Sequence, residues 1–153
     1  MARMASPSNQ PRVGVVVVTH ESAADALVAA TRALLGNVPG LTAVPCGMAE
    51  QFPSVVEKIS RGCQLVDEGA GVVVLVDLHG SSPFHAAMSL LDGSRDCEVL
   101  CGVNLPMLLK AATVDRSRQT PLALAETLRD TGRRAIRVGT ELTGRISINE
   151  KQP

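Results

Sequence analysis

Two unbroken apolar runs predict buried strands in the first half of the chain. The first covers Val13 to Thr19 and the second Val72 to Val76, and neither alternates between apolar and polar residues. Both runs are rich in β-branched residues, which is typical of central parallel strands buried on both faces. Two shorter runs, Leu41 to Cys46 and Cys97 to Val103, predict further strands, and Pro45 favours an edge position for the former.

The segments between these runs repeat apolar residues at helical spacing. The pattern predicts helices over Ser22 to Leu35, Glu50 to Glu68, Pro83 to about Leu91, Met107 to Thr113 and Pro121 to Asp130. Alternating strands and helices predict an α/β fold, in which an open, mainly parallel four-stranded sheet has helices on both faces. A strand order of 2-1-3-4 would make the first and third strands neighbours and place a ligand-binding switch point between their carboxyl ends.

The apolar pattern fades at both ends of the chain and indicates one domain with polar tails. We expect a disordered segment over residues 1–12, a domain over residues 13–138 and a polar tail over residues 139–153. No apolar run approaches the length of a membrane span, and the first residues lack the apolar core of a signal peptide. The pattern therefore favours a cytoplasmic protein without direct membrane insertion.

Composition narrows the classes of partner. The 153 residues carry no net charge, and phenylalanine, present twice, is the only aromatic residue type in the chain. Neither a basic patch nor a set of rings for stacking bases is present, so we expect no nucleic acid partner. No CxxC pair occurs, and we expect reduced, buried thiols rather than a metal site or a thiol switch at the cysteines, which are Cys46, Cys63, Cys97 and Cys101.

Polar residues end two of the predicted strands and suggest a reactive pair. His20 follows the first long run, and Asp77 follows the run that ends at Val76. If the two strands are neighbours, their carboxyl ends meet at one edge of the sheet and the carboxylate can contact the imidazole. Such a contact fixes the tautomer and leaves one ring nitrogen facing outward, which suits a nucleophilic histidine.

A small-residue loop beside this pair predicts an anion site. The loop contains Gly80, Ser81 and Ser82, and Pro83 follows it. A serine followed by proline is a helix-start pattern, with Ser82 as the cap and Pro83 as the first helical residue. Backbone N–H groups at a helix start attract anions, so we expect the three loop residues to bind a phosphate group.

Other chemistries are weaker but stay open. His79 and His85, together with His20 and Asp77, allow a small metal-dependent hydrolase, although no compact HxxxH or HxxE spacing supports it. Neither GxGxxG nor GxxxxGK[ST] is present after the first strand, which disfavours nucleotide binding. Thr19 and His20 stand where a response-regulator pocket would need carboxylates. We therefore expect no metal and no cofactor.

Three segments together resemble a known family. They are VVVVTH at residues 15–20, VDLHGSSPFHAA at residues 76–87 and CGVNLPMLLKA at residues 101–111. Their order and spacing are similar to those of the mannose-family EIIA component of the bacterial sugar phosphotransferase system, over roughly Val13 to Val138. This family differs at two loop positions, since its sugar-transporting members often have an aromatic residue in place of His79 and glycine in place of Ser81.

The resemblance implies a phosphocarrier. In the family, the histidine that corresponds to His20 accepts a phosphoryl group from phospho-HPr and passes it to an EIIB domain. Asp77 corresponds to the aspartate that bonds this histidine, and Ser82 to the loop serine. The family is usually a homodimer that exchanges a terminal strand, here Arg134 to Val138. Because the chain ends soon after this region, we expect a separate EIIB protein as acceptor, or else a regulatory sensor without one.

Overall fold

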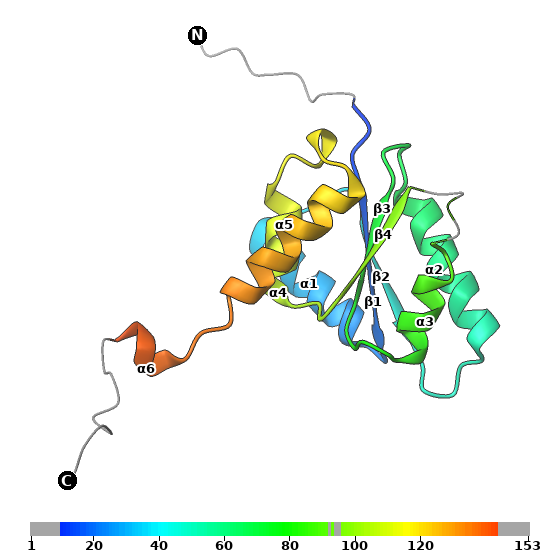
Figure 1. Cartoon of the computed structure of the whole chain (residues 1–153), viewed down its shortest axis with the longest axis horizontal. Helices are drawn as coiled ribbons and strands as arrows, with labels where there is room; N and C mark the ends of the chain where they lie inside the picture. The colour runs from blue at the N-terminus through cyan, green and yellow to red at the C-terminus, as the bar shows by residue number, and fades with distance from the viewer. Residues whose placement is uncertain (1–9, 92, 94–95, 144–153) are drawn as a thin grey trace.

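The computed structural model describes residues 10–91, 93 and 96–143, and these form a layered α/β structure (Figure 1). A parallel sheet has the order β2-β1-β3-β4, which confirms the predicted order 2-1-3-4. Its strands are β1 (Gly14–His20), β2 (Leu41–Cys46), β3 (Val72–Val76) and β4 (Cys97–Cys101). The parts of the predicted tails at residues 1–9 and 144–153 lie outside the described residues.

Helices cover both faces of the sheet, as predicted. On one side lie α1 (Ala23–Leu35), α4 (Leu105–Thr113) and α5 (Pro121–Arg134), whereas α2 (Phe52–Val66) and α3 (Ser82–Met88) lie on the other (Figure 1). A short 3-10 turn, η1 (Arg116–Arg118), joins α4 to α5. No helix among the described residues is long and apolar enough to cross a membrane.

Strand β1 runs through the centre of the core. Val15 and Val17 contact the layer of α1, α4 and α5, and Val16 and Val18 contact the layer of α2 and α3. All four side chains are fully buried. The absence of polar alternation in this segment is thus explained, because a strand covered on both faces has no solvent-facing positions.

The two edge strands are less covered than the centre. Pro45 lies in β2, which pairs only with β1, as the missing N–H of proline favours. The prediction of buried cysteines is correct for Cys46 and Cys63 but wrong for Cys97 and Cys101, which are partly exposed. The reason is that β4 is also an edge strand, so neighbours shield one of its sides only.

The end of α5 corrects one expectation. The sequence pattern predicts that this helix ends at Asp130, but it continues through Arg134, so the predicted strand from Arg134 to Val138 does not begin there. Gly132 is buried against α4, and a Cβ on it would lie 2.9 Å from Met107 Cγ. Close helix packing therefore keeps a residue type that usually ends helices. Residues 136–138 pair with no strand of the described chain, and α6 (Gly139–Leu142) follows.

The turn between α2 and β3 provides a test of the packing. Gly69 and Gly71 both have positive φ angles, of 103° and 84°, and both N–H groups donate to Asp67 Oδ1. A Cβ on Gly71 would collide with the backbone oxygen of Asp96 and lie 2.7 Å from Pro121 Cγ, whereas a Cβ on Gly69 would meet no atom within 4 Å.

We therefore expect Gly69→Ala to lower the free energy of unfolding by about 1–2 kcal/mol, the usual cost of a left-handed conformation. Gly71→Ala should lower it by at least about 1 kcal/mol more, because the backbone around Asp96 must also move. Urea denaturation of both variants and the parent chain measures the two values. Equal losses would show that the contact with Asp96 adds no strain.

Candidate functional site

The structure brings together the histidine and aspartate that end β1 and β3. Val18 pairs with Val76 in the register of the two strands, so the residues that follow emerge side by side. Asp77 Oδ2 accepts a hydrogen bond from the His20 backbone N–H at 2.8 Å and lies 2.9 Å from His20 Nδ1. Its other oxygen, Oδ1, accepts from the Leu78 N–H at 2.8 Å. A single carboxylate thus holds both the backbone and the ring of His20.

These contacts determine the charge of Asp77. Partial burial alone would raise its pKa, but the hydrogen bonds from the His20 N–H, the His20 ring and the Leu78 N–H outweigh burial and lower the pKa below its usual range. An ionised carboxylate can only accept hydrogen bonds, so Nδ1 of His20 carries the proton that faces it. In the neutral ring, Nε2 then presents its lone pair.

Nε2 is open to a ligand. Within the described part of the chain this nitrogen makes no hydrogen bond, and the His20 side chain is 31% exposed. A neutral imidazole with one nitrogen held and the other accessible is a ready nucleophile or general base.

The backbone turns sharply after His20. Glu21 has a φ angle of 47°, which is rare for a residue with a side chain. Its N–H donates to the Cys46 carbonyl at 2.8 Å, and its Oε1 accepts from the Met48 N–H at 2.9 Å. Below the turn, the buried Thr19 hydroxyl accepts from the Ala24 N–H at the start of α1. These contacts hold the strained turn and tie it to the loop after β2.

The loop before α3 corrects the predicted helix start. Helix α3 begins at Ser82, and its cap is Ser81, whose Oγ accepts from the Phe84 N–H at 3.3 Å and donates to the Leu78 carbonyl at 2.8 Å. Pro83 is tolerated after the first helical residue because the first N–H groups of a helix have no partner within the helix. Ser82 is consequently free of the capping role: its hydroxyl and N–H make no hydrogen bond with described residues.

A small cavity of about 80 Å³ joins these parts. His20, Ser82 and Pro83 line it. The other lining residues belong to the end of β2, the loop that follows it and the first turn of α2, namely Cys46, Gly47, Met48, Glu50 and Val55. Of the predicted phosphate-binding residues, only Ser82 reaches the cavity. Gly80 is exposed, with a φ angle of 77° that its missing side chain permits.

Glu50 was not predicted from the sequence to be a residue of the site. Its Oε1 accepts from Lys58 Nζ at 2.8 Å and from the Gly47 N–H at 2.9 Å, and these two bonds lower its pKa, that with Lys58 most. Lys58 also donates to the Pro45 carbonyl. Glu50 Oε2 is buried and has no hydrogen-bond partner in the structure. The pair therefore shapes the loop that forms one wall of the cavity, through tertiary contacts that no local pattern signals.

The two other histidines lie apart from the cavity. Both histidines contact the ring of Phe84. Its centroid lies 4.8 Å from that of the His79 ring and 5.3 Å from that of the His85 ring. Neither histidine lines the cavity with His20. Over residues 10–91, 93 and 96–143, no group of three or more His, Cys, Asp or Glu side chains is arranged to hold a metal ion.

Comparisons with known proteins identify relatives of this chain. The family model described as the PTS system fructose IIA component, EIIA-man, matches residues 14–128. The mannose-specific EIIAB component of Escherichia coli K12 is 36% identical over 131 residues, which cover 82% of this chain and 39% of that protein. The fructose-specific EIIA component of Bacillus subtilis is 28% identical over 102 residues, which cover 67% of this chain and 70% of that protein.

Solved structures show the same fold. The phosphotransferase system component EIIA from Streptococcus agalactiae matches with a TM-score of 0.76 and 18% identity, over 84% of this chain and 98% of that one. This chain spans about two fifths of the length of the Escherichia coli relative.

The contacts of Asp77 make a pH prediction. Because its pKa is lower in the folded protein than in the unfolded chain, about 3.9, its contribution to stability is complete above about pH 5 and is lost as the pH falls through the folded pKa. We expect the parent chain to be more stable than Asp77→Asn at pH 7, and this difference to shrink below about pH 4. Urea denaturation across this range measures it. A difference that is constant with pH would contradict the ionised carboxylate.

Proposed function

The chain belongs to the EIIA-man family of phosphotransferase system IIA components, and from this premise we propose that it is a phosphocarrier. In this proposal, His20 accepts a phosphoryl group from phospho-HPr and passes it to a separate EIIB protein during sugar uptake. The observation that carries the proposal is the hydrogen bond between Asp77 Oδ2 and His20 Nδ1, because it leaves Nε2 as the nucleophile.

The proposed transfer needs no reactant other than the phosphoryl donor and His20. The Nε2 lone pair of His20 attacks the phosphorus of the donor, a nitrogen–phosphorus bond forms, and the donor takes back the electron pair of the bond that breaks. The proton on Nδ1 stays in place, so positive charge develops on the ring and the adjacent Asp77 carboxylate stabilises it. Transfer to the acceptor is the same step in reverse. Positioning and electrostatic stabilisation supply most of the acceleration in such reactions.

Loop residues would bind the phosphoryl oxygens. Ser82 is the main candidate because its hydroxyl and N–H have no partner among described residues and because it lines the His20 cavity. Ser81 would act through the loop, since its hydroxyl is engaged at both Leu78 and Phe84. Gly80 would permit the turn that presents them.

Exposed apolar side chains suggest where protein partners would dock. Met48 and Phe52 follow β2, and Leu78 follows β3. All three therefore lie beyond the carboxyl ends of the strands, as His20 does. Their exposed fractions are 77%, 45% and 59%. Apolar residues around a reactive histidine fit an interface with a carrier protein better than a site for a free sugar. In keeping with its family, we also propose that the protein acts in the cytoplasm.

We also propose that the chain forms the homodimer implied by its family. Ile136 and Val138, in the segment after α5, are 77% and 56% exposed. The outer edge of β4 pairs with no strand in the described residues. Exchange of residues 136–138 between two chains would cover both features.

The direct test is the intact mass after incubation with Enzyme I, HPr and phosphoenolpyruvate. We expect a single acid-labile phosphoryl group on the parent chain and none on His20→Ala. His79→Ala and His85→Ala are matched controls and should be labelled as the parent is, because their rings stack on Phe84 rather than line the cavity. Phosphorylated His20→Ala protein would end the proposal. A phosphoryl group that is not passed on to any EIIB protein would instead favour the alternative of a regulatory sensor.

Asp77→Asn tests the role of the carboxylate in transfer. The amide must direct an N–H either at the two donors that now meet Oδ2 or at the Leu78 N–H, so at least one hydrogen bond is lost along with the charge. We expect the rate of phosphorylation to fall at least about tenfold, which corresponds to about 1.4 kcal/mol. Rapid-quench kinetics with saturating phospho-HPr measures it, and an unchanged rate would make Asp77 a purely structural residue.

A further inference from the structure

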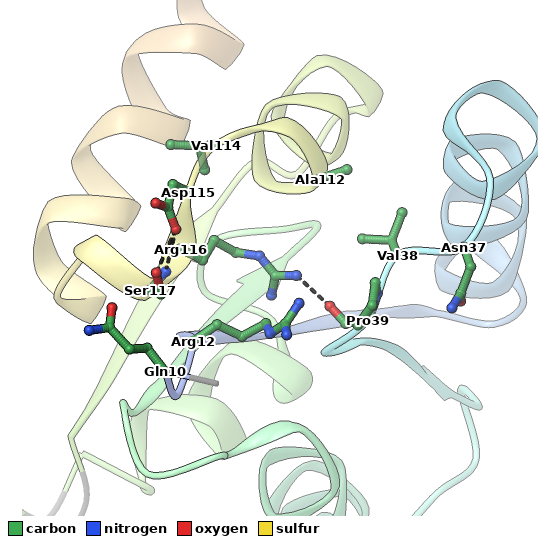
Figure 2. Close-up of a pocket in the computed structure, with 10 residues that line it drawn as sticks. All are labelled: Gln10, Arg12, Asn37, Val38, Pro39, Ala112, Val114, Asp115, Arg116 and Ser117. Carbon is green, nitrogen blue, oxygen red and sulfur yellow. Dashed lines mark hydrogen bonds between the residues drawn. The ribbon is translucent and has the colours of Figure 1, made fainter. Parts of the chain in front are cut away.

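A second cavity lies at the opposite end of the sheet from His20. It has a volume of about 250 Å³ and is formed by the segment before β1, the loop before β2 and the turn η1 (Figure 2). Arg12 and Arg116 line it, together with Gln10 and Asn37. It shares no residue with the His20 cavity, so a ligand here would be independent of the proposed function of His20.

Arg116 is a buried cation without a counterion. Among the described residues it is the only charged residue that is buried, and it is 6% exposed. Nη1 donates to the carbonyls of Val13 at 2.8 Å and Gly40 at 3.1 Å, and Nη2 donates to the carbonyl of Pro39. All these acceptors are neutral. Among the described residues, Arg116 forms no ion pair with a carboxylate.

The charge of Arg116 is therefore only partly stabilised. Burial, and then repulsion by Arg12, lower the pKa of Arg116, and attraction to Glu68 compensates in part. A buried charge is unfavourable unless an opposite charge or strong hydrogen bonds offset the loss of water. A guanidinium group also carries more N–H donors than the three hydrogen bonds of Arg116 use.

Arg12 brings a second guanidinium to the same place. A Cβ on Gly40 would lie 3.2 Å from Arg116 Nη1 and 3.6 Å from Arg12 Cδ, so the two side chains meet at this glycine. Figure 2 shows both guanidinium groups extending toward the Pro39 side of the cavity. Arg12 Nε pairs with Glu68 at 3.3 Å, but its terminal nitrogens make no hydrogen bond to any described residue.

The acidic residue on the wall is engaged elsewhere. Asp115 Oδ1 accepts from the N–H of Ser117 at 3.2 Å and from its hydroxyl at 2.6 Å, and Oδ2 lies 3.3 Å from Arg118 Nε. These hydrogen bonds to Ser117 are visible in Figure 2. Asp115 and Glu68 are thus paired with Arg118 and Arg12, and the positive charge of Arg116 is the one left over.

We propose that this cavity binds a small phosphoryl-bearing anion between Arg12 and Arg116. The terminal nitrogens of Arg12 form an open planar fork that matches the oxygens of a phosphate group, and Arg116 adds a second positive charge with N–H donors to spare. The volume suits inorganic phosphate or a phosphate ester of a few carbons and is below the usual range for larger ligands, about 300–1,000 Å³. The neutral amides of Gln10 and Asn37 also line the cavity.

The test is an NMR titration of the full chain at constant ionic strength, with inorganic phosphate and, separately, glycerol 3-phosphate. We expect saturable shifts of the backbone amides of Val38, Gly40 and Ser117 with both probes. Arg12→Gln should weaken binding by about tenfold, because a bidentate charged contact is lost. A tighter fit for the ester would identify an esterified ligand, and equal affinities would identify free phosphate.

Two matched variants separate this site from other causes. Arg61→Gln removes the same charge from an exposed arginine on α2, and His20→Ala removes the other candidate phosphate site, so both should leave the titration unchanged. Should Arg12→Gln fail to fold, Asn37→Ala, at an exposed position of the same cavity, takes its place and should also weaken binding. Absence of saturable shifts, shifts confined to His20 and Ser82, or equal losses in Arg12→Gln and Arg61→Gln would each overturn the proposal.

Discussion

The site depends on one oxygen atom. Asp77 Oδ2 accepts from the backbone N–H of His20 and contacts the ring of the same residue, so it sets the position of the strand end and the orientation of the imidazole together. This contact requires the exact pairing of Val18 with Val76. A slip of one residue between β1 and β3 would direct one side chain to the opposite face of the sheet and separate the pair. The stability of the sheet is therefore a condition of the chemistry.

Burial on both faces is what makes that pairing secure. Every residue of β3 is fully buried, as are Val15 to Val18 of β1, and each strand has a helical layer on either side. A shifted register would place these side chains against the wrong partners throughout two core clusters. Loops at the carboxyl edge, by contrast, contribute little to the core and are available for binding.

The sequence predicted those parts of the structure that repeat a general rule. Unbroken apolar runs located β1 and β3, and the order of a doubly wound sheet then brought His20 next to Asp77. It did not predict features that arise from contacts distant along the chain. Glu50 is one example, because it is held beside the cavity by Lys58 of α2. A second miss is local: the two adjacent serines leave the cap of α3 open, and Ser81 takes it with an extended backbone and a hydroxyl that bonds both Leu78 and Phe84.

Arg116 and Asp77 together restrict the movement of β1. Arg116 holds the carbonyl of Val13 just before the strand, and Asp77 holds the N–H of His20 at its last residue, so the strand is fastened at both ends. If His20 gains and loses a phosphoryl group as proposed, a strand held at both ends needs almost no rearrangement in either direction. The phosphorylated and unphosphorylated proteins would then differ little in conformational energy. Most of the free energy of the phosphoryl bond would remain available for transfer to the acceptor.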